Sequence, residues 1–243
     1  MGKIRLDKYL ADAGCGTRSE VKLSIRKGKV TVNGENCRSP EQKVDPEADE
    51  IEVDGIALSW KKHEYLMLHK PAGCVTATRD NHDQTVMDLI GGTKRKELFP
   101  VGRLDKDTEG LLLITDDGEL AHRLLAPNNH VDKTYFVRVS GVISEKGAEM
   151  LTQGMDIGEK SRTLPAKLEI LRQGECSEAL LTIREGKFHQ VKRMFHGIGN
   201  EVLYLKRLSM GSLTLDEGLE PGKYRELTEE ELRSLREEVH LNE

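Results

Sequence analysis

The stretch GRLDKDTEG, residues 102–110, contains side chains that could carry out nucleophilic or acid–base chemistry. Asp105 stands two residues after Arg103 and directly before Lys106 and Asp107. A free aspartate has a pKa of about 3.9, so its carboxylate is ionised at neutral pH and can attack an electrophilic carbon or accept a proton. The same nine residues are also typical of a tight charged turn. Their local composition alone favours the turn.

Positive charge is concentrated in two segments of an otherwise acidic chain. The 243 residues carry a formal net charge of -5, yet residues 1–30 hold eight Lys or Arg against three acids and residues 184–207 hold six against two. Residues 31–58 hold two against eight, and the tail from residue 216 holds four against ten. A polyanion responds to the local field rather than to the net charge. Residues 1–30, called the N-terminal island below, and residues 184–207 are therefore compatible with a nucleic-acid partner.

Composition excludes several other classes of protein. No apolar run approaches the length of a membrane span, and the charged N-terminus has no signal-peptide core, so we expect a cytoplasmic protein with no membrane partner. The four cysteines, at positions 15, 37, 74 and 176, form no C-x-x-C pair and are expected to be reduced thiols. The chain has neither a P-loop nor a dinucleotide fingerprint nor a clustered His/Cys site. These absences are consistent with a protein that requires no metal and no cofactor, which is also what the family resemblance of the later motifs implies.

The N-terminal island has the pattern of a small helical module. Apolar residues at helical spacing predict a helix over 4–13, and a second helix follows from a cap at Thr17 or Ser19 to Gly28. In the second helix we expect Val21, Leu23 and Ile25 to make apolar contacts. Short strands within 29–34 and 49–55 end in Asn-Gly and Asp-Gly turns. These elements predict a domain over residues 1–58.

A second domain is predicted over residues 65–243, after a charged linker at 59–64. Its predicted strands lie within 65–73, 110–118, 133–141, 164–173 and 177–186, and its predicted helices at 119–125, 144–151 and 188–196. Thr228 and Glu231 are spaced as a capping box for a last helix. Strands outnumber helices and turn signals recur, which favours an α+β fold with a mixed, mostly antiparallel central sheet flanked by helices.

The segment IRLDKYLADAGCGTRSEVKLSIRKGKVTVNG, residues 4–34, resembles the S4 RNA-binding domain, an αL-like fold. Its order of L-D-K-x-L, a Gly-rich break, a T-R pair, a basic helix and G-x-V-x-V-N-G carries the resemblance. The alternative is an ordinary basic helical hairpin whose charges are exposed to solvent. If the resemblance holds, cations on two helices contact RNA phosphates, which gives affinity with little sequence readout; these are Arg5, Lys8, Arg18, Lys22, Arg26 and Lys27.

Four later segments resemble, in order, the pseudouridine synthases that modify small-subunit ribosomal RNA. They are LMLHKPAGCVTAT, FPVGRLDKDTEGLLLITDDGELAHRL, HVDKTYFVRVSG and EGKFHQVKRMFHGIGNEVLYLKRLSMG. The resemblance implies an isomerisation in which the C1'–N1 bond of a uridine breaks, the uracil turns, and C5 bonds to C1'. By resemblance Asp105 is the reacting carboxylate. Three possibilities stay open for it: attack on C1', attack on C6 of the base, or removal of a proton.

The resemblance also assigns roles to three partners of Asp105. A uridine in folded RNA must be flipped out to reach the carboxylate, and Arg103 is expected to fill the space near the vacated base. Tyr135 would stack on the flipped uracil and could move a proton; the alternative is a core tyrosine. Lys192 would pair with the acid, although many relatives carry Arg there, whose planar fork a Lys lacks. The alternative for Lys192 is an exposed helix lysine.

Other residues of these motifs are expected at the RNA or in local structure. His189, Gln190, Arg193 and Arg207 are expected to contact RNA, the two arginines through its backbone. Lys106, Asp107, Thr108 and Glu109 are expected to shape the turn or form local ion pairs, and His69, His122 and His196 to be structural or to face the RNA.

The resemblance predicts a target in 16S ribosomal RNA, either naked or in a small-subunit assembly intermediate, modified by a monomer that does not act on DNA. The nearest alternative is a uridine of 23S RNA; the Phe-His-Gln of FHQVKRMF favours the small subunit, because large-subunit relatives more often have Arg-Gln or Asn-Arg-Gln there. The second alternative is a non-catalytic S4-containing assembly factor, against which intact Asp105, Tyr135 and Lys192 argue.

Overall fold

The computed structural model describes residues 2–46, 48–58, 63–91 and 97–241. Two compact units divide the chain, Met1–His63 and, from Glu64 onward, Glu64–Gly91 with Leu98–Glu243. The predicted linker, residues 59–64, falls at this division, and its residues 59–62 lie outside the described part. No helix among the described residues is long and apolar enough to cross a membrane.

The N-terminal unit packs two helices against a small sheet. Helix α1 (Leu6–Asp12) and helix α2 (Arg18–Arg26) lie beside the sheet order β3-β2-β5-β6, and a separate two-stranded ladder joins β1 to β4. Leu6, Tyr9, Leu10 and Ile25, each at most 1 % exposed, belong to its core. The strands are β1 (Ile4–Arg5), β2 (Val30–Val32), β3 (Glu35–Cys37), β4 (Lys43–Val44), β5 (Ile51–Val53) and β6 (Ile56–Ala57).

Two local predictions in this unit need correction, and one is resolved. The first helix begins at Leu6 rather than residue 4, because Ile4 pairs with Val44 in the β1–β4 ladder. The side chain of Leu23 is 55 % exposed, so it makes no core contact, whereas Val21 is buried. Thr17 is the cap of α2, in a reciprocal capping box with Glu20.

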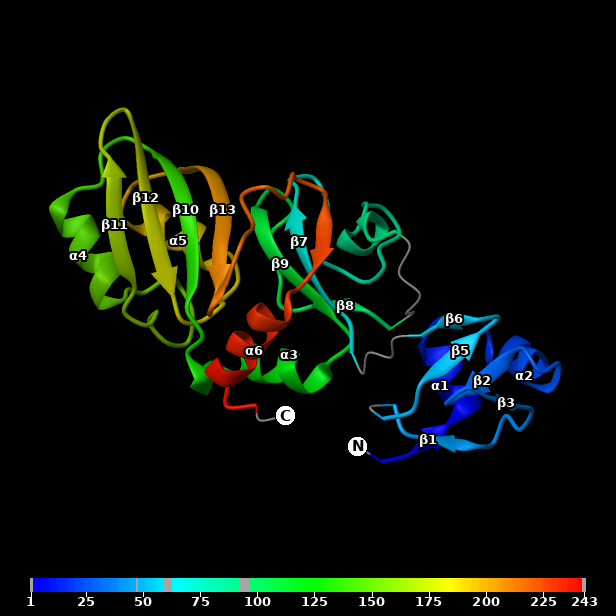
Figure 1. Cartoon of the computed structure of the whole chain (residues 1–243). Coiled ribbons are helices and arrows are strands. Elements are labelled where there is room, and N and C mark those ends of the chain that lie inside the picture. The colour runs from blue at the N-terminus through cyan, green and yellow to red at the C-terminus, as the bar shows by residue number, and fades with distance from the viewer. Residues whose placement is uncertain (1, 47, 59–62, 92–96, 242–243) are drawn as a thin grey trace. The chain divides into compact units, whose positions relative to one another are not determined.

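The second unit is built on a nine-stranded sheet of order β11-β12-β10-β13-β9-β7-β15, with β14 added on β13 and β8 on β9 (Figure 1). The β13–β9 pair is parallel and the other pairs are antiparallel, so the predicted mixed, mostly antiparallel sheet is confirmed. The strands are β7 (Tyr65–Lys70), β8 (Phe99–Pro100), β9 (Glu109–Thr115), β10 (Lys133–Ser140), β11 (Lys167–Arg172), β12 (Cys176–Ile183), β13 (Val202–Met210), β14 (Leu213–Thr214) and β15 (Tyr224–Glu226).

Four α-helices and two 3-10 helices complete the described part of this unit. They are η1 (Val86–Leu89), α3 (Gly118–Leu125), η2 (Pro127–Asn129), α4 (Glu145–Gln153), α5 (Gln190–Gly197) and α6 (Glu229–Glu238). The predicted capping box of Thr228 and Glu231 starts α6. The third predicted helix starts at Gln190 rather than residue 188, because His189 has left-handed backbone angles and cannot be its first turn.

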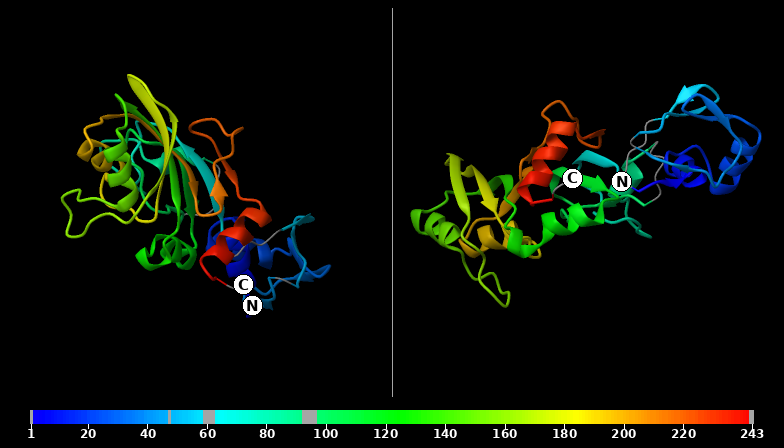
Figure 2. Two further views of the ribbon diagram at one scale, coloured as in Figure 1. Left: turned by 90° about the vertical axis from the view of Figure 1, so that its left-hand side faces the viewer. Right: turned by 60° about the horizontal axis from the view of Figure 1, so that its bottom comes forward.

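Helices cover the two halves of the sheet separately. Helices α4 and α5 pack on the face of the β11-β12-β10-β13 half that carries Val137, Val139 and Leu181, and Figure 2 shows both helices on one side of these strands. Helices α3 and α6 pack instead against β9, β7 and β13 through a core that includes Leu111, Leu113 and Met210. A pocket forms between the first residues of β10 and the first turn of α5.

The two halves join through a short parallel contact that depends on a glycine. Lys206 pairs with Glu109, and Arg207 pairs with Gly110. A Cβ on Gly110 would lie 2.2 Å from the carbonyl oxygen of Arg207, and the φ of +109° is one that side chains rarely adopt. No other residue type fits this seam without moving β13.

Candidate active site

A pocket of about 700 Å³ opens within the second unit, a size suited to a small ligand. Six segments line it: the turn 102–108, residues 125–127 at the end of α3, strand β10, Ser161, the segment from 183 to 192, and strand β13. Of the four motifs that resemble pseudouridine synthases, the last three contribute residues to this pocket. The first motif, LMLHKPAGCVTAT, does not line it. Asp105, Tyr135, Lys192, Arg103, His189, Gln190 and Arg207 all line it.

The first of these motifs holds the turn that carries Asp105. Lys70, at the end of β7, is fully buried, and its Nζ donates to the carbonyls of Lys106 (3.3 Å), Thr108 (2.8 Å) and Pro71 (3.0 Å). Burial lowers the pKa of Lys70, while nearby carboxylates, Asp105 among them, act in the opposite direction.

Three further hydrogen bonds, from Gly73 and Thr76, hold the same turn. The hydroxyl of Thr76 donates to the carbonyl of Leu104 at 2.8 Å and accepts from its amide at 3.1 Å. The amide of Gly73 donates to the carbonyl of Lys106 at 2.7 Å. The backbone on both sides of Asp105 is therefore held by a segment some 30 residues earlier in the chain.

Asp105 has two cationic or ionisable neighbours from the α5 region. The Nζ of Lys192 lies 3.4 Å from its Oδ2, and the Nε2 of His189 lies 3.4 Å from its Oδ1. Lys192 makes its closer contact, 2.5 Å, with Asp107, and this hydrogen bond is the main cause that lowers the pKa of Asp107. Asp107 therefore forms an ion pair, as expected for a residue of the turn. Its partner is Lys192, which was expected to pair with Asp105.

Phe188 and His189 form a stacked aromatic pair at the rim of the pocket. The rings of Phe188 and His189 stack with centroids 3.8 Å apart and planes 19° apart. Phe188 is 66 % exposed although it is a large apolar residue. The left-handed backbone of His189, φ +49°, turns the chain so that its ring can reach Asp105.

Three polar side chains share the sheet face that floors the pocket. Lys133 and Tyr135 are two residues apart on β10 and so point to the same face, and Arg207 is directly opposite Tyr135 on β13. Their exposed fractions are 8 %, 8 % and 2 %. Tyr135 also belongs to the core with Leu205, so it both packs in the core and lines the pocket.

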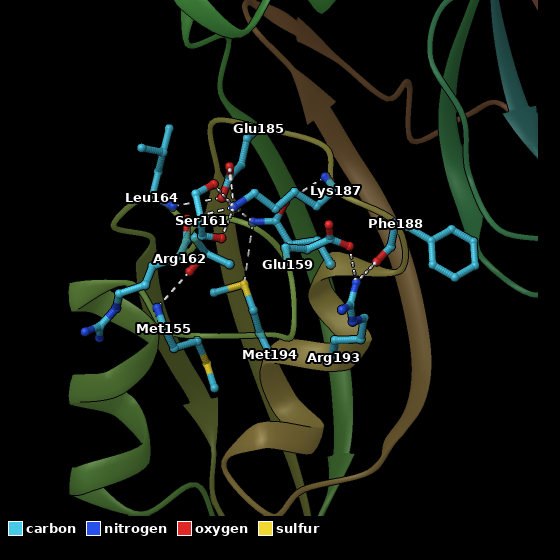
Figure 3. Close-up of polar contacts among 12 residues, drawn as sticks. Met155, Glu159, Ser161, Arg162, Leu164, Glu185, Lys187, Phe188, Arg193 and Met194 are labelled. Atoms are coloured by element: carbon cyan, nitrogen blue, oxygen red, sulfur yellow. Dashed lines mark hydrogen bonds and ion pairs between the residues drawn. The ribbon is translucent and has the colours of Figure 1, made fainter.

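The loop 154–164, whose Ser161 lines the pocket, is held by Lys187 and Glu185. The Nζ of Lys187 donates to the carbonyls of Ser161 and Arg162, both at 2.7 Å (Figure 3). Glu185 accepts from the amide of Leu164 at 2.8 Å and from the side-chain amide of Gln190 at 2.9 Å. These contacts fasten the loop 154–164 to the segment that leads into α5.

Two predicted RNA contacts take part in this internal network. Arg193 donates to the carboxylate of Glu159 at 2.7 Å and to the carbonyl of Phe188 at 3.1 Å (Figure 3). It also donates to the carbonyl of Ile157. Gln190 is 4 % exposed, and its side-chain oxygen accepts from the amide of Lys187. In the structure both residues hold the loop, and their roles as RNA contacts stay predictions.

In the N-terminal unit, a buried carboxylate organises two of the six predicted RNA-binding cations. Arg5 donates to both oxygens of Asp7, at 2.9 and 2.8 Å, and Lys22 lies 3.7 Å away. Asp7 is 2 % exposed, and the hydrogen bonds from Arg5 lower its pKa. The other four, Lys8, Arg18, Arg26 and Lys27, are exposed.

The sequence interpretation missed Lys70, Lys133 and Lys187. Lys70 ends a buried strand and Lys133 precedes Tyr135 by two residues, so both carried a usable signal: a lysine at a position where the strand pattern predicts burial. Lys187 has no such signal, because its partners are carbonyl oxygens of a distant loop.

Comparison with known proteins gives a consistent result over nearly the whole chain. The family of RNA pseudouridylate synthases matches residues 64–197, and the S4 domain matches residues 4–51. An uncharacterized RNA pseudouridine synthase of Bacillus subtilis is 49 % identical over 96 % of this chain and 99 % of its own. The ribosomal small subunit pseudouridine synthase A of Escherichia coli is 41 % identical over 96 % of this chain and 100 % of its own, and that of Vibrio vulnificus is 45 % identical over 96 % and 99 %. A crystal structure of a pseudouridylate synthase superposes with a TM-score of 0.67 at 41 % identity, over 96 % of this chain and 99 % of that one.

Proposed function

Since the chain belongs to the RNA pseudouridine synthase family and carries an S4 domain ahead of the catalytic domain, we propose that it converts one uridine of 16S ribosomal RNA to pseudouridine. The observation that carries the reaction is Asp105, an acid at the wall of the pocket with a lysine 3.4 Å from its carboxylate. The expectation of an RNA pseudouridine synthase, drawn from the sequence motifs, is confirmed.

Asp105 is the reacting carboxylate in this proposal. Lys192 orients it by charge attraction, since its Nζ lies 3.4 Å from Oδ2 of Asp105. The turn that holds Asp105 is anchored by carbonyl contacts to Lys70, so the carboxylate is fixed before the substrate arrives. Fixed geometry of this kind lowers the reorganisation needed in the transition state.

The flipped uridine enters the pocket with its base over the sheet face. Tyr135 offers its ring to the uracil from this face. Arg103, exposed at the rim, fills the space that the base leaves in the RNA. Flipping costs a few kcal/mol of stacking, which the basic surface of the S4 domain offsets by phosphate contacts.

We propose 16S RNA as the target because relatives named for the small subunit resemble this chain over nearly its full length. The relatives of Escherichia coli and Vibrio vulnificus are named for the small subunit, and each match spans both domains. A 23S target or a non-catalytic assembly role has no comparable support. The remaining parts of the proposal are a monomer that works in the cytoplasm on 16S RNA or on a small-subunit assembly intermediate.

The test uses 16S and 23S RNA carrying tritium at C5 of uridine. The protein is expected to release tritium from 16S RNA without added metal, and mapping should find one modified nucleotide. Asp105→Asn should abolish release and keep RNA binding. Modification of 23S RNA alone would contradict the target, and turnover by Asp105→Asn would contradict the catalytic role.

Asp107→Asn is the matched control. It removes a second carboxylate that also contacts Lys192, two residues away from Asp105. Because Lys192 keeps Asp105 as a partner, this variant should retain measurable tritium release. Equal loss in both variants would assign the effect to Lys192 rather than to a reacting carboxylate.

A further inference from the structure

The floor of the pocket holds two buried cations, Lys133 and Arg207, that the proposed reaction steps do not use, although Arg207 was expected to contact the RNA backbone. Arg207 and Lys133 are 2 % and 8 % exposed, and both line the pocket. The two are close enough for Arg207 to lower the pKa of Lys133, although burial is the larger cause. Two positive charges held next to each other without bulk water are unfavourable unless something offsets them.

The hydrogen bonds of this pair leave part of its donors without a protein partner. Arg207 donates through Nε to the carbonyl of Leu111 at 2.8 Å, and Lys133 donates to the carbonyl of Val131 at 2.9 Å. The Nη2 of Arg207 is buried without a hydrogen-bond partner, and so is the hydroxyl of Thr108, which also lines the pocket. Buried polar atoms in native proteins are nearly always paired, so these orphaned atoms point to a missing polar ligand.

The reaction creates a group that fits this floor. When the C1'–N1 bond breaks, its electron pair stays on the uracil ring and spreads over N1, O2 and O4. Attack of a carboxylate on C6 would also place negative charge on a ring oxygen, O4. Each of the three open routes for Asp105 therefore builds negative charge on uracil oxygens.

We propose that Lys133 and Arg207 form an anion-binding floor that donates hydrogen bonds to the oxygens of the uracil while it is detached from the ribose. The inference rests on the proposed function, because it requires the flipped uridine to occupy this pocket. Preorganised donors in a dry site stabilise developing charge without having to reorganise. C5 then bonds to C1', the proton on C5 leaves, and a proton returns to N1, so that no atom is gained or lost overall.

The RNA phosphate is the other anion that the pair could bind. A flipped nucleotide remains connected at both its phosphates to the strand outside, whereas its base enters the pocket deepest. At 2 % and 8 % exposure the two cations lie at the depth of the base. The base is therefore the occupant that the burial favours, and binding of a phosphate becomes an outcome of the test.

The experiment compares uridine with 5-fluorouridine at the target position of the RNA. Fluorine withdraws electrons and stabilises the detached uracil anion, so the fluorinated base needs less help from the floor. Lys133→Met should lower the single-turnover rate of uridine conversion about 100-fold, as removal of an oxyanion donor does. On 5-fluorouridine the fluorine stays on C5 because it cannot leave as a proton does, so the rate is measured as consumption of this nucleoside by chromatography of nuclease digests. The loss there should be at least tenfold smaller.

Arg184→Gln is the matched control, because Arg184 also lines the pocket but is exposed and paired with Asp132. Its loss, whatever its size, should be equal on both substrates. Equal losses for Lys133→Met would overturn the inference, and a change confined to RNA affinity would assign the pair to a phosphate. If the wild-type protein converts neither substrate, the proposed function fails instead.

A pH profile tests the same inference with a variant that keeps the positive charge, should Lys133→Met fail to fold. The pKa of Lys133 is lowered to about 8, by burial and by Arg207, while Asp132 and Glu238 of α6 act in the opposite direction. In the wild type, kcat/KM should therefore fall as the pH rises above about 8. Lys133→Arg, which stays charged, should lose this fall. An unchanged alkaline limb in Lys133→Arg would contradict the inference.

Discussion

Replacing Lys133 by methionine is expected to stabilise the protein at pH 7 while it impairs catalysis. Lys133 is 8 % exposed, and the pKa of its ammonium falls from 10.5 to about 8 on folding. Each pKa unit corresponds to about 1.4 kcal/mol, so keeping Lys133 charged in the folded state costs about 3 kcal/mol. Methionine removes that penalty and loses the hydrogen bond to Val131, worth about 1 kcal/mol. The net gain is about 2 kcal/mol.

The size of this stabilisation depends on pH in a way that identifies its cause. Between pH 8 and 10.5 the unfolded chain holds the proton of Lys133 more tightly than the folded chain, so wild-type stability rises over this window. At pH 10 wild-type Lys133 is already mostly neutral, and the advantage of methionine should fall to near zero.

Urea unfolding of Lys133→Met and the wild type at pH 7 and pH 10, followed by circular dichroism, measures both differences. Lys146→Met on the exposed side of α4 is the control, and should change stability by less than about 0.5 kcal/mol at either pH. A Lys133→Met protein that is less stable than the wild type at pH 7, or a gain that persists at pH 10, would refute the reasoning.

Three further predictions concern the catalytic turn, the pocket rim and the S4 domain. Lys70→Met removes the ammonium that holds the carbonyls of Lys106 and Thr108, and should cost about 2 kcal/mol of transition-state stabilisation, or roughly 30-fold in kcat. RNA affinity, measured by filter binding, should stay unchanged. A fall in affinity instead would refute a role confined to the turn. Phe188→Ala should weaken RNA binding about tenfold, since stacking of a base on an aromatic ring is worth about 1–3 kcal/mol, while Phe188→Trp should restore it; equal affinities for the two variants would exclude stacking. Changing the exposed S4 cations together to glutamine should reduce the slope of log affinity against log salt by roughly three, measured by fluorescence anisotropy, and an unchanged slope would move the phosphate contacts elsewhere; these cations are Lys8, Arg18, Arg26 and Lys27.

The elements that sequence patterns predicted well are those whose signals are local. The capping box at Thr228 and the alternating residues of β10 each act within a few positions, and the structure contains both. Strand β13 was missed because Lys206 and Arg207 stand side by side in its middle, which is typical of a basic loop. In the structure they point to opposite faces of the sheet, and Arg207 is buried.

Proximity within the site could not be read from the residues themselves. Lys192 meets Asp105 only because α5 begins after the left-handed turn at His189, and nothing local to either segment encodes their approach. The resemblance to known synthases supplied that pairing. It did not reveal that Lys192 lies closer to Asp107, since this distance depends on two side-chain conformations.

The seam between Gly110 and Arg207 also bears on the order in which the protein assembles. These two residues are 97 positions apart, whereas β10 and β12 or β11 and β12 pair across much shorter stretches of chain. Closing a long loop is entropically slow, so each half-sheet can gain its hairpins before the parallel contact forms. Asp105 precedes β9 on one half and Tyr135 lies on the other. During refolding, enzymatic competence should therefore return after most of the secondary structure has formed.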